Sequence, residues 1–339
     1  MERYSAFRDP GTGIQPFLTP VAPRTADASL ATVLSPILYL LGALRTLLLL
    51  VLAVLHVSLV EPLKLVPTPP TRLVAHLLTA FTTRLALLIL GVLWLPVELV
   101  SRRRQRASSP IGWNPRAGDV IVSNWVSIFE LLWLAFRFDP VFTIPVISSE
   151  DSREIAGFRK ASLWQIICFT SRTPQVGQSY EALERIRKQA SRPIVVFPEC
   201  TTSNGRGLLK FADVFQQQAS VPAKTYQIFV MAIRYESPTT FQPSLSHSIP
   251  TPANPLSTVF RATATIAPAS PSIRLLSARD GPSSETFDAT EVIGQSPYSL
   301  AEICGTLAAT TGKLKRTGQG WQEKVAFLQF HAKAGKRSQ

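Results

Sequence analysis

A short polar turn at residues 197–211 holds the residue types with the most chemistry in this sequence. It reads Phe-Pro-Glu-Cys-Thr-Thr-Ser-Asn-Gly-Arg-Gly-Leu-Leu-Lys-Phe, so small polar residues follow an apolar strand and lead to Arg206. Successive backbone amides in such a turn, with hydroxyl groups and an arginine beside them, form a concave set of donors that binds anions. The turn therefore predicts a site for a phosphate or a similar anion.

A second polar stretch lies earlier, at residues 120–130, and reads Val-Ile-Val-Ser-Asn-Trp-Val-Ser-Ile-Phe-Glu. The apolar residues predict a strand, and the residues after it predict a helix with Glu130 in its first turn. A carboxylate there either stabilises the helix N-terminus or takes part in a site. Trp125 carries a donor and no basic nitrogen, so it cannot accept a proton, and its plainest role is that of a core aromatic.

Together with residues 168–172, Cys-Phe-Thr-Ser-Arg, these stretches resemble the phospholipid/glycerol acyltransferases, the 1-acylglycerol-3-phosphate acyltransferase superfamily. The similarity is strongest to a divergent fungal branch of lysophosphatidic acid:oleoyl-CoA acyltransferases that overlaps with proteins named for vacuolar protein sorting. It covers roughly residues 85–235. The resemblance implies an α/β domain with a mixed sheet flanked by helices. It also implies acyl-CoA as co-substrate, a lysophospholipid acceptor, and no metal or permanently bound cofactor.

In that superfamily a histidine, four variable residues and an aspartate follow a strand that ends in Ser-Asn. The histidine takes the proton of a glycerol hydroxyl, and the aspartate orients its ring. Here Trp125 stands at the histidine position and Glu130 at the aspartate position, so these two are the candidate catalytic positions. Three alternatives follow. The chain is inactive, another group such as His76, His247 or a water near Glu130 supplies the base, or positioning of the reactants suffices, which is worth about 7–11 kcal/mol.

The resemblance also implies a set of substrate contacts. Arg172 is expected to contact the acceptor phosphate, and Glu199 to hydrogen-bond the glycerol or to organise the loop around it. Cys200 replaces a glycine, and a buried structural thiol is a commoner reading of it than a nucleophile. Arg206 is expected to serve in place of the arginine that other branches have at position 202. The predicted substrate-binding residues are Asn124, Ser127, Arg172, Glu199, Cys200, Thr201, Thr202 and Arg206.

The composition points to lipid rather than nucleic acid. The 339 residues are 46% hydrophobic with a mean hydropathy of +0.16, which is high for a soluble domain. A net charge of +13 favours anionic partners, and the basic clusters flank apolar segments, so the expected partner is a phospholipid membrane. The three scattered cysteines fit a reducing compartment.

Two apolar blocks, residues 28–60 and 73–100, predict membrane attachment. Arg45 and Arg84 interrupt them, which leaves open a spanning hairpin that turns at 67–70 or two helices partly in the interface. The basic cluster at 101–106 places the following domain on the cytosolic side. The expected location is the membrane of the endoplasmic reticulum or of lipid droplets.

The pattern divides the chain into a mobile arm (1–28), membrane-associated helices with a basic flank (29–106), an acyltransferase-like domain (107–312) and a basic tail (313–339). The domain has a core at 115–235 and a loop-rich part at 237–290. Within it, the apolar runs predict strands at 119–124, 141–146, 193–197 and 226–235, and helices at 127–138, 158–167 and 179–190.

Two functions fit these observations. The first is acyl transfer from acyl-CoA to a lysophospholipid, with lysophosphatidic acid as the expected acceptor and phosphatidic acid as product. The second is a catalytically impaired relative that binds phospholipid or acyl-CoA and acts in trafficking or at lipid droplets.

Overall fold

The computed structural model describes residues 4–23, 28–66, 68–102, 112–150, 152–216, 225–251, 253–285, 287–294 and 299–336. The helices are η1 Ser5–Phe7, α1 Ala28–Leu65, α2 Pro69–Ile89, α3 Phe129–Phe138, α4 Leu163–Phe169, α5 Leu183–Gln189, α6 Leu256–Thr263, η2 Ala278–Asp280, α7 Thr290–Ile293, α8 Leu300–Gly312 and α9 Trp321–Lys336. The strands are β1 Val97–Val100, β2 Val120–Ser123, β3 Val141–Ile147, β4 Gly157–Ala161, β5 Gln175–Val176, β6 Ile194–Val196, β7 Gly207–Leu208, β8 Ile228–Arg234, β9 Ser272–Leu276 and β10 Lys315–Arg316.

A mixed sheet forms the centre of the domain, with strand order β1-β9-β8-β2-β6-β3-β4 and β5 paired to β3. Strand β2 lies between β6 and β8 and is parallel to both, so Ile121 pairs with Val195 on one side and with Phe229 on the other. Because β2 and β6 are parallel, they end at the same edge of the sheet, where ligands bind in open α/β sheets. The two polar stretches that follow these strands therefore meet at one edge. The α/β class with a mixed sheet between helices, expected from the sequence, is confirmed.

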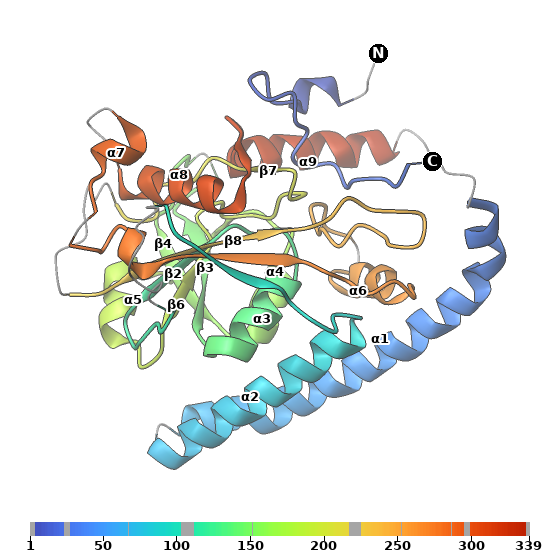
Figure 1. Cartoon of the computed structure of the whole chain (residues 1–339), viewed down its shortest axis with the longest axis horizontal. Helices are drawn as coiled ribbons and strands as arrows, with labels where there is room; N and C mark the ends of the chain where they lie inside the picture. The colour runs from blue at the N-terminus through green and yellow to red at the C-terminus, as the bar shows by residue number, and fades with distance from the viewer. Residues whose placement is uncertain are drawn as a thin grey trace.

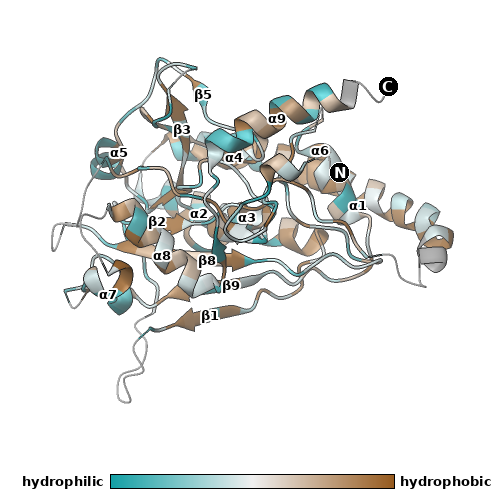
Figure 2. Ribbon diagram, turned by 90° about the horizontal axis from the view of Figure 1, so that it is seen from above, coloured by the Kyte–Doolittle hydropathy of each residue, from teal (hydrophilic) through white to brown (hydrophobic). Residues whose placement is uncertain are grey.

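Alternate residues of the central strands face two different cores. Ile121 and Val195 pack in the core on the side of α3 and the α1–α2 hairpin, whereas Val120 and Val196 pack in the core under α5 and α8. Figure 1 shows α8 on one side of the strands and α3 with the α1–α2 hairpin on the other, and Figure 2 shows β1 and β3 in the brown of hydrophobic residues. Strands buried on both faces explain the nearly continuous apolar runs in the sequence.

Four strands lie where the apolar runs predict them, at β2, β3, β6 and β8. The helix predicted over 158–167 is wrong in its first half, because residues up to Ala161 form strand β4 and helix α4 begins at Leu163. Ser162 sets this boundary through a capping box. Its hydroxyl accepts from the Gln165 amide at 3.3 Å, and the Gln165 side chain accepts from the Ser162 amide at 3.0 Å.

Helices α1 and α2 form a hairpin that turns between Leu65 and Pro69. Within the described residues, Thr32–Leu65 and Pro69–Ile89 are long and apolar enough to cross a membrane. This supports membrane association. Strand β1 occupies the end of the second predicted block, so the apolar residues at 97–100 belong to the sheet instead.

The two arginines of the apolar blocks donate to backbone carbonyls, Arg45 to the domain and Arg84 to the segment that follows α2. Arg45 Nη1 donates to the carbonyls of Thr265 at 2.8 Å and Thr263 at 3.4 Å, and Arg84 donates to those of Leu93 at 2.8 Å and Val92 at 3.3 Å. Carbonyl partners lower the cost of placing a guanidinium beside lipid. Other faces of α1 carry exposed leucines, such as Leu40 at 75%. Arg103, Arg104 and Arg106 of the basic cluster lie outside the described residues.

The N-terminal segment packs against α9, which differs from the mobile arm expected from its composition. Phe17 and Phe327 are buried at 1% and 0% exposure, and their rings lie 5.5 Å apart. The basic tail is correspondingly ordered as α9 over most of its length, and Trp321, the first residue of this helix, is buried. Figure 1 shows the blue N-terminal segment beside the red α9. The aromatic residues of the tail make these apolar contacts, although the tail as a whole is basic.

The close approach of α1 to α6 generates a first prediction. A Cβ at Gly42 would lie 2.8 Å from the Ala264 Cβ, whereas a Cβ at Gly305 in α8 would meet only an ordinary contact, at 3.4 Å to Phe211. We expect Gly42→Ala to lower the free energy of unfolding by about 1–3 kcal/mol through overpacking. The matched Gly305→Ala should raise it by about 0.5–1 kcal/mol, because glycine disfavours helix interiors. Denaturant titration in detergent measures both, and equal effects would contradict the α1–α6 contact.

Candidate active site

Asn124 continues the sheet beyond the last residue of β2. Its side-chain amide donates to the Ile233 carbonyl at 3.0 Å and accepts from the Ile233 amide at 2.8 Å. These bonds take the place of a backbone ladder, so the chain can leave the strand while β8 stays in register. Asn124 therefore fixes where the following residues, including Trp125, enter the site.

Trp125 is fully buried and joins all three polar stretches. Its ring stacks on Phe197 at 4.7 Å and on Phe169 at 6.1 Å between centroids. Its backbone carbonyl accepts from the Ser203 amide at 2.9 Å. Its indole N–H is buried without a hydrogen-bond partner. Trp125 thus connects the three stretches by packing. Its indole has no basic nitrogen, so it cannot accept a proton.

Glu130 reaches back from α3 to the loop before it. One carboxylate oxygen accepts from the amides of Val126 and of Ser127, the latter at 2.6 Å, and the other accepts from the Tyr235 hydroxyl. Burial raises the pKa of Glu130 to about 7, although these hydrogen bonds act to lower it. Its oxygens are committed to this loop.

Glu199 clamps the turn at 197–211 to the end of β2. Its two oxygens accept from the amides of Trp125 at 2.5 Å and of Leu209 at 2.8 Å. Burial raises the pKa of Glu199 to about 8 against the effect of these two bonds. Of the two roles that the resemblance implies, organising the loop is the one that these contacts favour.

The polar residues of the turn also bond within the protein. Thr201 donates to the Arg172 carbonyl at 2.7 Å, and Thr202 donates to the His247 carbonyl at 2.5 Å. Cys200 has a φ of 56°, a left-handed conformation that favours glycine, and burial raises the pKa of its thiol. The backbone therefore keeps at Cys200 the shape that glycine gives to related turns, and the thiol stays protonated.

Arg172 and Arg206 are the two predicted anion contacts whose side chains reach solvent. Arg172 follows Ser171, a buried residue with a φ of 73° that turns the chain outward after α4. The Arg206 amide bonds to the Asn204 side chain at 3.1 Å, which leaves its guanidinium at the surface. The hydroxyls are thus engaged inside, and the charged groups lie at the rim.

Lys324 of α9 is a buried residue of the site. It is not predicted from the pattern, because it lies in a tail that is basic in sequence. Its ammonium donates to the Thr202 carbonyl at 2.7 Å and to its hydroxyl at 3.2 Å. Burial lowers the pKa of Lys324, and the charge of Glu199 opposes this. Its signal in the sequence is its place between Trp321 and Phe327, one turn from each, on the buried face of the helix.

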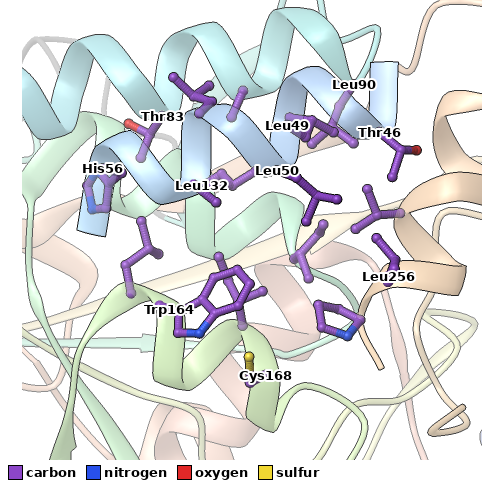
Figure 3. A pocket seen from close by; sticks show the side chains of 18 of the residues that line it. Thr46, Leu49, Leu50, His56, Thr83, Leu90, Leu132, Trp164, Cys168 and Leu256 are labelled. Carbon is purple, nitrogen blue, oxygen red and sulfur yellow. The ribbon is translucent and has the colours of Figure 1, made fainter. Parts of the chain in front are cut away.

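An apolar cavity of about 390 Å³ lies between the hairpin and helices α3, α4 and α6. In Figure 3, Trp164 and Cys168 rise from α4 toward Leu49 and Leu50 of α1, with Leu256 of α6 at one side. The volume falls within the range of about 300–1,000 Å³ for small-molecule sites. Its lining includes residues next to the polar stretches, namely Ile128, Cys168 and Asn254.

Several buried polar atoms around these stretches have no hydrogen-bond partner. Within the described part of the chain they include Trp125 Nε1, Ser127 Oγ, Ser171 Oγ, both ring nitrogens of His247 and Asn254 Oδ1. Each such atom costs about 1–3 kcal/mol if it stays unpaired. They lie beside the three polar stretches, so polar groups of a substrate bound there could pair with them. No group of three potential metal ligands occurs among the described residues.

Stability should depend on pH through Glu130. Because its folded pKa is raised, the folded protein binds more protons than the unfolded chain between about pH 4.5 and 7, so stability falls as pH rises through 7. Glutamine mimics the protonated acid, accepting from the two amides and donating to Tyr235. We expect Glu130→Gln to gain about 1–3 kcal/mol relative to the native protein between pH 5 and 8. Denaturant titration at each pH measures this, with exposed Glu154→Gln as control, and a constant difference would contradict it.

Comparison with known proteins supports a general acyltransferase function. The chain is 25% identical over 242 residues to a Schizosaccharomyces pombe protein named "Putative lysophosphatidic acid:oleoyl-CoA acyltransferase". The aligned region covers 70% of this chain and 74% of that protein. No family model matches the chain. No solved structure matches it either.

Proposed function

We propose that this protein is a membrane-associated O-acyltransferase that moves a fatty acyl group from acyl-CoA to a lysophospholipid, with lysophosphatidic acid as acceptor and phosphatidic acid as product. The observation that carries the proposal is the meeting of three polar stretches beside an apolar cavity roofed by the hairpin. A polar site and an apolar cavity side by side match a substrate with a reactive head and a long tail. The name of the fission yeast relative gives the same two substrates.

The cavity suits the acyl chain. Its walls are leucine, isoleucine, valine and alanine side chains from α1, α2, α3, α4 and α6, with few polar groups. Two of these walls belong to the helices that would touch lipid, so a chain could enter from the membrane without crossing water. Burying it there gains roughly 0.8 kcal/mol for each methylene group.

The rim suits the phosphate of the acceptor. Arg172 and Arg206 are exposed and follow buried turn residues, so their guanidinium groups can move onto a phosphate without breaking internal bonds. Arginine binds phosphate through two parallel hydrogen bonds. Asn124, Ser127, Cys200, Thr201 and Thr202 then act by shaping the site between this rim and the cavity.

The same account includes the fold and the location. We assign the domain to the glycerolipid acyltransferase type, held on the cytosolic face of the endoplasmic reticulum or of lipid droplets by the hairpin. The bonds from Arg45 to the carbonyls of Thr263 and Thr265 tie α1 to the domain, which favours a hairpin that enters one leaflet beside the site. The site then faces a substrate that lies in the membrane.

A second candidate is a lipid-binding relative without turnover. It is favoured by one observation, because Trp125 cannot take a proton and the carboxylates of Glu130 and Glu199 are both committed to backbone amides. Such a protein would bind acyl-CoA or lysophospholipid saturably and release no product.

Release of free CoA separates the two. Purified protein in phospholipid vesicles should liberate CoA thiol only when oleoyl-CoA and lysophosphatidic acid are both present, because neither substrate alone completes the reaction. No release above a protein-free vesicle blank, across lysophospholipid acceptors, would reject the enzyme. Saturable acyl-CoA binding in that case would support the second candidate.

The arginines predict how the acceptor is recognised. Arg172→Ala and Arg206→Ala should each raise the KM for lysophosphatidic acid about 10-fold or more, since a hydrogen bond to a charged group contributes about 1.5–3 kcal/mol. The kcat should change little, and an acceptor without phosphate, such as a monoacylglycerol, should lose nothing. Arg159→Ala, an exposed arginine on β4, is the matched control. A KM that follows the control in both variants would place the phosphate elsewhere.

A further inference from the structure

His247 lies in the segment between β8 and α6 and is built into the candidate site through its backbone. Its amide donates to the Val126 carbonyl at 2.8 Å, and its carbonyl accepts from the Thr202 hydroxyl at 2.5 Å. Val126 directly follows Trp125, and Thr202 lies in the turn clamped by Glu199. The backbone of His247 is therefore fixed between the two stretches that the resemblance connects with catalysis.

The chain has four histidines, and His247 is the one whose backbone bonds to the polar stretches. His56 and His76 belong to the hairpin, where His56 bonds to the Thr82 hydroxyl at 2.8 Å. His331 stacks on Tyr4 at the outer side of α9, with ring centroids 6.1 Å apart. His56 also lines the apolar cavity, on the side of the hairpin, so His247 is the histidine that lies with the polar stretches.

The ring of His247 is buried at 2% residue exposure, and neither of its nitrogens has a hydrogen-bond partner. Asn254 interacts with this ring. Its amide nitrogen donates to the carbonyls of Thr170 at 2.9 Å and Cys168 at 3.3 Å, which fixes the side chain, and its oxygen has no partner. Asn254 also lines the apolar cavity, so the residue that interacts with the imidazole is part of the cavity wall.

We propose that His247 is the general base of the acyl transfer and that Asn254 positions its ring, a pair that takes over from a histidine at position 125. In this pair Asn254 Oδ1 would accept from one ring N–H, which would leave the other nitrogen as a proton acceptor. This inference rests on the proposed function, because it needs an alcohol and a thioester in the site. The proposed base comes from the segment between β8 and α6 rather than from the end of β2.

The step balances without a further reactant. As the acceptor hydroxyl attacks the thioester carbonyl, the new C–O bond forms and the free nitrogen of His247 takes the hydroxyl proton. Collapse of the tetrahedral intermediate breaks the C–S bond, and the imidazolium returns the proton to the leaving CoA sulfur. The ring is neutral again after each turnover.

The surroundings keep this ring neutral. Burial and then the positive charge of Lys324 lower the pKa of His247 to about 4, and the Asn254 side chain acts in the opposite direction. The ring can therefore accept a proton at neutral pH. The negative phosphate of a bound acceptor would oppose the Lys324 charge and strengthen the base once the substrate is in place.

The test uses full-length protein in vesicles with oleoyl-CoA and lysophosphatidic acid. His247→Ala should lower kcat about 10²–10⁴-fold, the usual contribution of a general base, with both KM values within about threefold. Added imidazole should restore part of the rate. His331→Ala is the matched control and should keep the native kcat. An unchanged kcat in folded His247→Ala would overturn the proposal, as would a loss that imidazole leaves untouched while the KM values rise.

Asn254 gives a second, independent arm if His247→Ala fails to fold. Asn254→Ala should lower kcat about 10-fold at constant KM, and Asn254→Gln, which keeps both the amide donor and the acceptor oxygen, should recover part of it. A native rate in Asn254→Ala would overturn the pair. If the unmodified protein releases no CoA with any acceptor, the proposed function fails first. A native enzyme that is active and unaffected by both substitutions rejects only the His247–Asn254 pair.

Discussion

One buried carboxylate, that of Glu199, holds the candidate site together by accepting hydrogen bonds from two backbone amides. Glu199 bonds to Trp125 at the end of β2 and to Leu209 at the far end of its own turn. A carboxylate kept wholly from water is costly, and the raised pKa of Glu199 expresses that cost. Lys324 offsets part of it from beneath the turn. Without this clamp, the turn would lose its place beside β2, and the contacts of Thr201 and Thr202 would go with it.

The clamp explains how a tryptophan is accommodated at position 125. With its amide held by Glu199 and its ring packed between Phe169 and Phe197, Trp125 serves as the core that joins three segments. A histidine there could not fill the same volume. In the proposed reaction the general base then comes from another side chain near the joined segments. His247 is such a residue, because its backbone bonds to Val126 and to Thr202.

Much of the fold could be predicted from the sequence, because strands buried on both faces leave apolar runs and the hairpin leaves two long apolar blocks. The meeting of the two polar stretches also follows from the parallel pairing of β2 and β6. From the sequence, His247 is one of several open candidates for the base, and the placement of His247, Asn254 and Lys324 in the site could not be predicted. They come from a proline- and serine-rich segment and from a basic tail, and their positions depend on tertiary contacts with Val126, Thr170 and Thr202 that leave no periodic pattern. Strand β4 is predicted as part of a helix for a different reason, because only the capping residue Ser162 separates it from α4.

An experimental structure with lysophosphatidic acid and a thioether analogue of oleoyl-CoA tests the central claim most directly. The account predicts the acyl chain in the cavity between α1 and α4, the phosphate on Arg172 or Arg206, and the acceptor hydroxyl within hydrogen-bonding distance of the His247 ring. An acyl chain bound on the outer face of α1, with the hydroxyl remote from His247, would contradict it.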